Sequence, residues 1–82
     1  MELNLIPQVI RTYYHKDNNK LEEEYFQLNG KKEGEYKSYY DNGRLYIICN
    51  YINGLKEGEY KQYYSNGNLW TVHHYLSDKK EG

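Results

Sequence analysis

Histidine and cysteine supply much of the metal-binding and nucleophilic chemistry of proteins, and this chain has three His and one Cys. His73 and His74 are adjacent, and adjacent residues of a β-strand point to opposite faces of a sheet. No cysteine pair or carboxylate lies at ligand spacing from them, so we expect paired or solvated histidines and no metal site. Cys49 has no basic or histidine neighbour among its expected strand partners. It is interpreted as a small buried hydrophobic residue rather than a nucleophile.

Acidic and glycine-containing segments are the next candidates for chemistry. The run Glu22-Glu23-Glu24 alternates between strand faces, which separates the carboxylates that general acid/base catalysis would need together. Lys-Glu-Gly occurs at 32–34, 56–58 and 80–82, but without the strand-to-helix context and Gly-x-x-x-x-Gly-Lys spacing of a phosphate-binding loop. No Ser-His-Asp set is suggested. The sequence therefore predicts no catalytic residue, no cofactor and no enzyme.

Composition narrows the function classes further. The 82 residues allow one domain at most. The formal net charge is −1 with acids and bases interspersed, so no field that would gather nucleic acid is expected. One cysteine cannot form an intramolecular disulfide, and the segment MELNLIPQVIR has neither a basic leader nor a long apolar run. These features predict a cytoplasmic or otherwise intracellular protein without a membrane span.

An internal repeat organises the chain. The segment GKKEGEYKSYYDNGRL at 30–45 returns as GLKEGEYKQYYSNGNL at 54–69, and 13 of 24 positions are identical between 30–53 and 54–77. A degenerate first copy spans 12–29, with two inserted residues after its tyrosine pair, and 78–82 resembles the start of another copy. Such periods indicate a stacked array in which each unit buries its face on its neighbour. We therefore expect one repeat domain over 1–82.

Each unit has the pattern of a β-hairpin. Asn42-Gly43 separates two strand-like runs and predicts a type I′ turn, whereas 53–58 predicts a longer loop. The residues singled out for turns are Asn42, Gly43, Gly54, Gly58, Asn66 and Gly67. No stretch has the apolar spacing of a helix. The expected fold is all-β: an elongated, single-layer antiparallel meander of repeated hairpins. Its six strands are expected near 8–14, 20–28, 35–40, 44–52, 59–64 and 68–76.

Turn length sets the register of each hairpin. A two-residue loop at Asn42-Gly43 places Tyr40 opposite Leu45, Ser38 opposite Ile47, Tyr36 opposite Cys49 and Lys37 beside Ile48. A three-residue loop would shift this register by one residue and re-pair the strands. The last expected strand, 68–76, has no successor in the pattern, which predicts an open sheet edge.

Aromatic side chains dominate the expected core. The chain has 12 Tyr but only eight Leu, five Ile and two Val, so rings must supply much of the packing. The candidate aromatic strip comprises Tyr36, Tyr39, Tyr40, Tyr60, Tyr63, Tyr64 and Trp70. One interpretation is structural, with stacked rings holding a thin sheet together. The other is a partly open strip that binds an extended peptide or a second copy of the chain. Both interpretations can hold together.

The repeated motif also carries a resemblance. Gly-x-Tyr-Lys-x-Tyr-Tyr-x-Asn-Gly-x-Leu at 34–45 and 58–69, followed by Tyr-x-Asn-Gly at 51–54, resembles the MORN-type repeat family. It is most similar to the variant class seen in bacterial proteins described as antitoxin components and in large DNA viruses of amoebae. The resemblance covers 12–82 and implies an elongated sheet of hairpins without catalytic machinery. The first copy departs from the pattern, with Asn18-Asn19 in place of Asn-Gly and Gln27 in place of Tyr51 and Tyr75.

These observations favour a non-enzymatic module for protein contact or self-association. We expect a protein partner that includes the chain itself, as a homodimer through the 68–76 edge or the aromatic face. One alternative is an antitoxin- or inhibitor-type binding protein, in the host cytoplasm if the source is viral. A membrane-surface adaptor is the other alternative, ranked lower because Lys31-Lys32 and Lys79-Lys80 are each followed by Glu, whereas lipid binding needs larger basic clusters.

Overall fold

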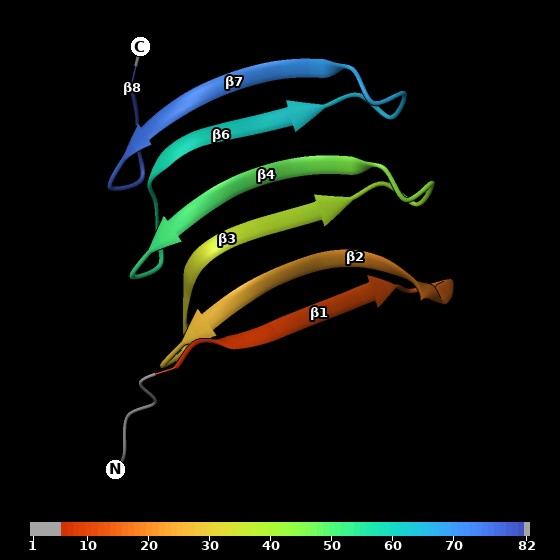
Figure 1. Ribbon diagram of the computed structural model, residues 1–82, viewed down its shortest axis with the longest axis horizontal. Coiled ribbons are helices and arrows are strands. Elements are labelled where there is room, and N and C mark those ends of the chain that lie inside the picture. Colours follow the sequence, from red (N-terminus) through yellow and green to blue (C-terminus); the bar gives the residue numbers. More distant parts are fainter. Residues whose placement is uncertain (1–5, 82) are drawn as a thin grey trace.

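The protein folds as one antiparallel sheet, seen in a computed structural model that describes residues 6–81 (Figure 1). Its strands are β1 (Gln8–Tyr14), β2 (Asp17–Leu28), β3 (Lys31–Tyr39), β4 (Leu45–Ile52), β5 (Leu55–Lys56), β6 (Gly58–Tyr63), β7 (Leu69–Leu76) and β8 (Lys79–Glu81). Their order in the sheet is β1-β2-β3-β4-β6-β7-β8, with β5 beside β4. The smallest extent is 15 Å, so the sheet is a single layer. The expected all-β, single-layer meander is confirmed.

Two-residue turns close one end of the strand pairs. They are Asn29-Gly30 between β2 and β3, Asn53-Gly54 between β4 and β5, and Ser77-Asp78 between β7 and β8. Both residues of each turn have positive φ, for example 53° at Asn53 and 83° at Gly54. This is the φ pattern of a type I′ turn, whose twist suits two antiparallel strands. The prediction of a longer loop from residue 53 to 58 is wrong, because β5 already pairs with β4 directly after the turn.

The turns at the opposite end are built differently. Gly43 has φ of 88°, and its N–H donates to the Tyr40 carbonyl at 2.9 Å. The Tyr40 N–H in turn donates to the Arg44 carbonyl at 2.8 Å. Asn42 does not have positive φ, so this is a type I turn followed by a G1 bulge at Gly43. The type I′ turn predicted for Asn42-Gly43 is therefore wrong, and Gly67 repeats the bulge 24 residues later with φ of 96°.

The bulge sets the register between β3 and β4. Tyr36 lies opposite Cys49, Lys37 opposite Ile48 and Ser38 opposite Ile47, as predicted for the two-residue loop. The register then shifts by one residue, and Tyr39 rather than Tyr40 lies opposite Leu45. The expected Tyr40–Leu45 pair is wrong for this reason. The same shift puts Tyr63 opposite Leu69 in the next unit.

The edge formed by β7 is partly covered. Lys79, Lys80 and Glu81 of β8 pair with Leu76, Tyr75 and His74. The prediction that the whole last strand forms an open edge is therefore wrong over its final three residues. Residues 69–73 of β7 have no partner strand on their outer side within the part of the chain that the structure describes.

The core is small and made mainly of half-buried rings. Among the described residues only Cys49 and Ser38 are buried, at 2% and 7% exposure, and no large side chain is fully buried. A single layer cannot enclose its side chains between two sheets, so rings from neighbouring strands cover one another instead. None of the described residues belongs to a helix that could cross a membrane.

Candidate functional site

Five tyrosines lie on one face of the sheet and are here called the tyrosine strip. Their rings form two contacting groups, Tyr25-Tyr36-Tyr51 and Tyr60-Tyr75. Strand alternation and register place them together, since Tyr25 pairs with Tyr36 and Tyr36 with Cys49. Tyr25 stacks on Tyr36 with ring centroids 5.6 Å apart, and Tyr36 meets Tyr51 edge-on at 5.9 Å. Such offset and edge contacts stabilise aromatic pairs beyond simple burial.

A lysine lies over each half of the tyrosine strip. The Lys32 ammonium is 5.0 Å from the ring centre of Tyr25 and 5.5 Å from that of Tyr51. Lys56, 24 residues later, lies 5.2 Å from Tyr60 and 5.0 Å from Tyr75. These separations are those of cation–π contacts. The two lysines thus cover rings that would otherwise face solvent.

Burial favours the neutral forms of several phenols on this face and of the Cys49 thiol. Burial, followed by the hydrogen bond that Tyr36 donates to the Glu23 carboxylate, raises the pKa of Tyr36. Burial is also the main cause that raises the pKa of Tyr51 to about 12 and of the Cys49 thiol to about 11. A thiol that is protonated at neutral pH is a poor nucleophile.

The predicted aromatic residues do not form one strip. Tyr36 and Tyr60 belong to the tyrosine strip, whereas Tyr40 packs on Tyr46 at 4.7 Å and Tyr64 stacks on Trp70 at 5.6 Å. These two pairs lie where the strands approach the bulged turns. The structure therefore divides the predicted set between the middle of the sheet and its turn end.

Tyr39 and Tyr63 take part through their backbone. The Tyr14 hydroxyl donates to the Tyr39 carbonyl, and the Tyr40 hydroxyl donates to the Tyr63 carbonyl at 2.8 Å. In each case the second tyrosine of one Tyr-Tyr pair contacts the first tyrosine of the next pair. This contact ties neighbouring hairpins together and gives the second tyrosine of each pair a structural role.

The predicted turn residues have local structural roles. The Asn42 side-chain oxygen accepts a hydrogen bond from the Arg44 N–H at 2.9 Å, and Asn66 does the same for Asn68. Gly54 and Gly58 adopt φ of 83° and 82°, a region that side chains disfavour. Asn42 also reaches the next unit, because its amide donates to the Ser65 carbonyl at 2.9 Å.

The role of the Lys-Glu-Gly motif was missed by sequence reasoning. Its glutamate, Glu33, accepts a hydrogen bond from the Asn53 N–H at 2.8 Å, and the Lys32 carbonyl accepts one from the Gly54 N–H at 2.9 Å. The same pair of contacts joins Glu57 and Lys56 to the turn at 77–78. The available signal was that the motif occurs three times, each time one residue after a two-residue turn.

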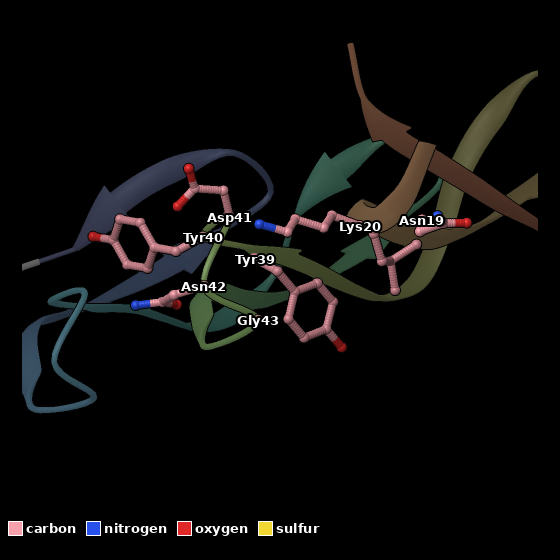
Figure 2. Close-up of a pocket in the computed structure, with 8 residues that line it drawn as sticks. Asn19, Lys20, Tyr39, Tyr40, Asp41, Asn42 and Gly43 are labelled. Carbon is pink, nitrogen blue, oxygen red and sulfur yellow. The ribbon is translucent and has the colours of Figure 1, made fainter. Parts of the chain in front are cut away.

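A cleft of about 450 Å³ opens between the tips of the first two hairpins (Figure 2). It is lined by Asn19, Lys20, Leu21 and residues 39–43. At the next junction Arg44 donates to the Asn66 carbonyl and closes the space between the tips. Lys20 precedes the strand leucine as Arg44 does, but its side chain forms no hydrogen bond or ion pair among the described residues. The departure of the first copy from the repeat pattern therefore leaves this junction open.

The cleft is lined by the opposite charges of Lys20 and Asp41. Lys20 and Asp41 also line a second cavity of about 360 Å³ at the same tip, with His15, Lys16 and Asp17. Asp17 is engaged by the Asn19 N–H at 3.0 Å. No group of three metal-ligating side chains occurs within residues 6–81.

The two histidines predicted to lie on opposite faces do so. His73 pairs with Tyr60 and lies 3.3 Å from the Thr71 hydroxyl. His74 pairs with Glu59 and approaches its carboxylate at 3.8 Å.

Comparison with protein families decides the nature of the repeat. The family described as the MORN repeat variant matches residues 32–53 and again 56–76, which together make up more than half of the chain. The chain belongs to the MORN repeat variant family. No curated protein and no solved structure matches the chain significantly. The two matched MORN segments contain the strand pairs β3–β4 and β6–β7, and β1–β2 extends the same sheet as a third pair.

Proposed function

We propose that this MORN repeat protein is a non-enzymatic interaction module that associates with itself and with other proteins. The observation that carries the proposal is the aromatic pair of Tyr64 and Trp70, which are 46% and 51% exposed. Trp70 lies in the part of β7 that lacks an outer partner strand among the described residues. Exposed tryptophan and tyrosine are typical of binding hot spots, and an unpaired strand offers backbone hydrogen bonds.

The charge pattern supports a protein partner over other classes. Salt bridges such as Arg11–Glu24 at 2.8 Å and Lys61–Glu59 at 3.5 Å neutralise charge locally across the sheet. Such a surface has no extended basic field for nucleic acid, and its lysines are not clustered as anionic lipid binding requires. The neutral thiol and phenols argue for recognition rather than catalysis.

Sedimentation equilibrium of charge variants tests the proposal. Trp70→Asp is expected to weaken self-association at least tenfold, because it places a carboxylate beside the open strand. Ile52→Asp is the matched control, since Ile52 is 56% exposed but flanks a turn at the other end of the strands. Circular dichroism checks the fold, and Trp70→Gln replaces Trp70→Asp if the charged variant unfolds. Equal association of all variants and the native chain would contradict the proposal.

A capture experiment separates the alternatives. Immobilised native chain and Trp70→Asp are exposed to a lysate of the source cells, and flotation with anionic vesicles is run alongside. A stoichiometric protein retained only by the native chain supports the interaction role and would also arise from an inhibitor-type function. Flotation with vesicles at low salt and no protein capture would favour the membrane-surface alternative.

A further inference from the structure

The two outer strands of the sheet are related by the repeat. β1 lies at one edge and β7, followed by the short β8, at the other. The β1 sequence QVIRTYY (8–14) occupies the same place in its unit as GEYKSYY (34–40) and GEYKQYY (58–64). In the next unit the strand that corresponds to β1 is β6. It pairs with β4 through Ile47–Gln62 and Ile48–Lys61. The outer side of β7 at 69–73 is therefore shaped for a strand of the β1 type.

The β8 strand leads up to that position. Lys79-Lys80-Glu81 corresponds to Lys31-Lys32-Glu33 and to Leu55-Lys56-Glu57, and in the second of these Gly58 begins β6. By the same correspondence, Gly82 aligns with Gly58, and a second copy would continue this strand from Val9, the counterpart of Glu59. The second copy would then meet β7 with the register that β6 has against β4.

Two kinds of hydrogen bond join neighbouring units. At the β7 edge one of them lacks its acceptor and the other lacks its donor among the described residues. The Tyr14 and Tyr40 hydroxyls donate to the Tyr39 and Tyr63 carbonyls, whereas the Tyr64 hydroxyl has no such acceptor within residues 6–81. The Lys32 and Lys56 carbonyls accept from the Gly54 and Asp78 N–H groups, whereas the Lys80 carbonyl has no such turn donor within residues 6–81. In the repeat relationship, Tyr13 and Gly30 of a second copy supply the missing acceptor and donor.

We propose that copies of this chain pair head to tail, with β1 of one copy antiparallel to residues 69–73 of β7 in the next. Thr12 of the second copy lies opposite Thr71, and Arg11 of the second copy opposite Val72. This inference rests on the self-association proposed above and specifies its geometry. Since each pair retains one unoccupied β1 edge and one unoccupied β7 edge, the assembly is open and can grow beyond a dimer.

Cysteine cross-linking tests the pairing. Thr12→Cys and Thr71→Cys are made separately, mixed and oxidised gently. Directly opposed residues in antiparallel strands have Cα atoms about 4.5–5.5 Å apart, within the range of a disulfide. Cys49 is retained, because it is 2% exposed and its oxidation in the native chain gives the background. A register control mixes Thr12→Cys with His73→Cys, two residues away on the same face.

Each outcome has one meaning. Head-to-tail pairing predicts a cross-linked dimer in the Thr12→Cys and Thr71→Cys mixture, at least tenfold above either variant alone and above the register control. A dimer from Thr71→Cys alone indicates symmetric β7–β7 pairing; it overturns the head-to-tail geometry but leaves self-association standing. Absence of every cross-link from associated protein also overturns the geometry. Absence of association in the native chain overturns both proposals.

Discussion

The Glu33 carboxylate accepts a hydrogen bond from the backbone N–H of Asn53, 20 residues later and one hairpin away, at 2.8 Å. Glu57 does the same for Ser77 at 3.0 Å. Both turn residues have positive φ, so each glutamate satisfies an N–H of the type I′ turn at the end of its own unit. Every unit thus fixes the turn that joins it to the unit that follows. The stacking of units therefore depends on these hydrogen bonds rather than on a large core.

Removal of this contact should destabilise the sheet measurably. Glu57→Ala is expected to lower the free energy of unfolding by about 0.5–1.5 kcal/mol, because the Ser77 N–H loses a charged acceptor. Glu59→Ala is the control: its carboxylate forms only the exposed ion pairs with Lys61 and His74, which contribute little. Urea denaturation measures both variants, and equal losses would contradict the role of Glu57.

Ser38 offers a stabilising change. Its hydroxyl is buried and has no hydrogen-bond partner, which costs free energy in the folded state. Ser38→Ala is expected to raise the free energy of unfolding by about 0.5–1 kcal/mol, because the unpaired polar atom is removed. Ser65→Ala, at an exposed turn position, should change it by less than about 0.5 kcal/mol. A loss of stability in Ser38→Ala, measured by urea denaturation, would argue against this account.

The bulged turn depends on the backbone of Gly43. Nothing lies within 4 Å of an added Cβ there, so any cost of a side chain comes from the φ of 88° alone. Gly43→Ala is expected to cost about 1–2 kcal/mol. Gly43→Asn should cost less, since asparagine tolerates positive φ better than other side chains. Thermal unfolding compares the two variants, and equal costs would contradict a purely conformational penalty.

Alkaline pH should weaken the fold through Cys49 and Tyr51. Burial raises the pKa of Cys49 from 9.0 to about 11 and that of Tyr51 from 10.0 to about 12. Between each unfolded and folded pKa the unfolded chain has lost a proton that the folded chain keeps, so stability falls as pH rises. The contribution is fully present below pH 9 and is lost between pH 9 and 12, at no more than about 1.4 kcal/mol per pH unit for each group.

Urea denaturation from pH 8 to 11 measures this dependence. Cys49→Ala should flatten the decline that begins at pH 9 and keep the part that begins at pH 10. Alanine does not titrate, and the replacement also lowers stability uniformly through lost packing. A stability that is independent of pH across this range would contradict the burial of the thiol and the phenol.

Much of the fold could be predicted from the sequence, because two copies of the repeat show the same pattern of strands and turns. The order of six strands follows from the alternating aromatic runs, and the Tyr36–Cys49 register follows from the turn position. The extent was predicted less well, because β2 begins at Asp17 rather than at 20 and β3 at Lys31 rather than at 35. Turn type could not be predicted in the same way, because Asn-Gly suits both the type I′ turn at Asn53-Gly54 and the bulge at Gly43. Which one forms depends on tertiary contacts, such as the Glu33 carboxylate, that the local sequence does not contain.

The aromatic residues were identified from the sequence, but their grouping was not. The one-residue shift after Ser38 and Gln62 moves the second tyrosine of each pair off the predicted face. The β8 strand was also missed, because three residues after a Ser-Asp turn carry little strand signal of their own. Residues 79–81 pair with β7 because the edge of β7 has unpaired backbone groups that bond to any extended neighbour.

Multi-angle light scattering of the native chain across a concentration series tests the central claim most directly. Because β1 and residues 69–73 of β7 are complementary edges, we predict a mass above the 10.0 kDa of one chain. That mass should rise through the dimer as concentration increases and fall to one chain in Trp70→Asp. A constant mass of 10.0 kDa at every concentration would contradict the claim that this repeat protein associates with itself.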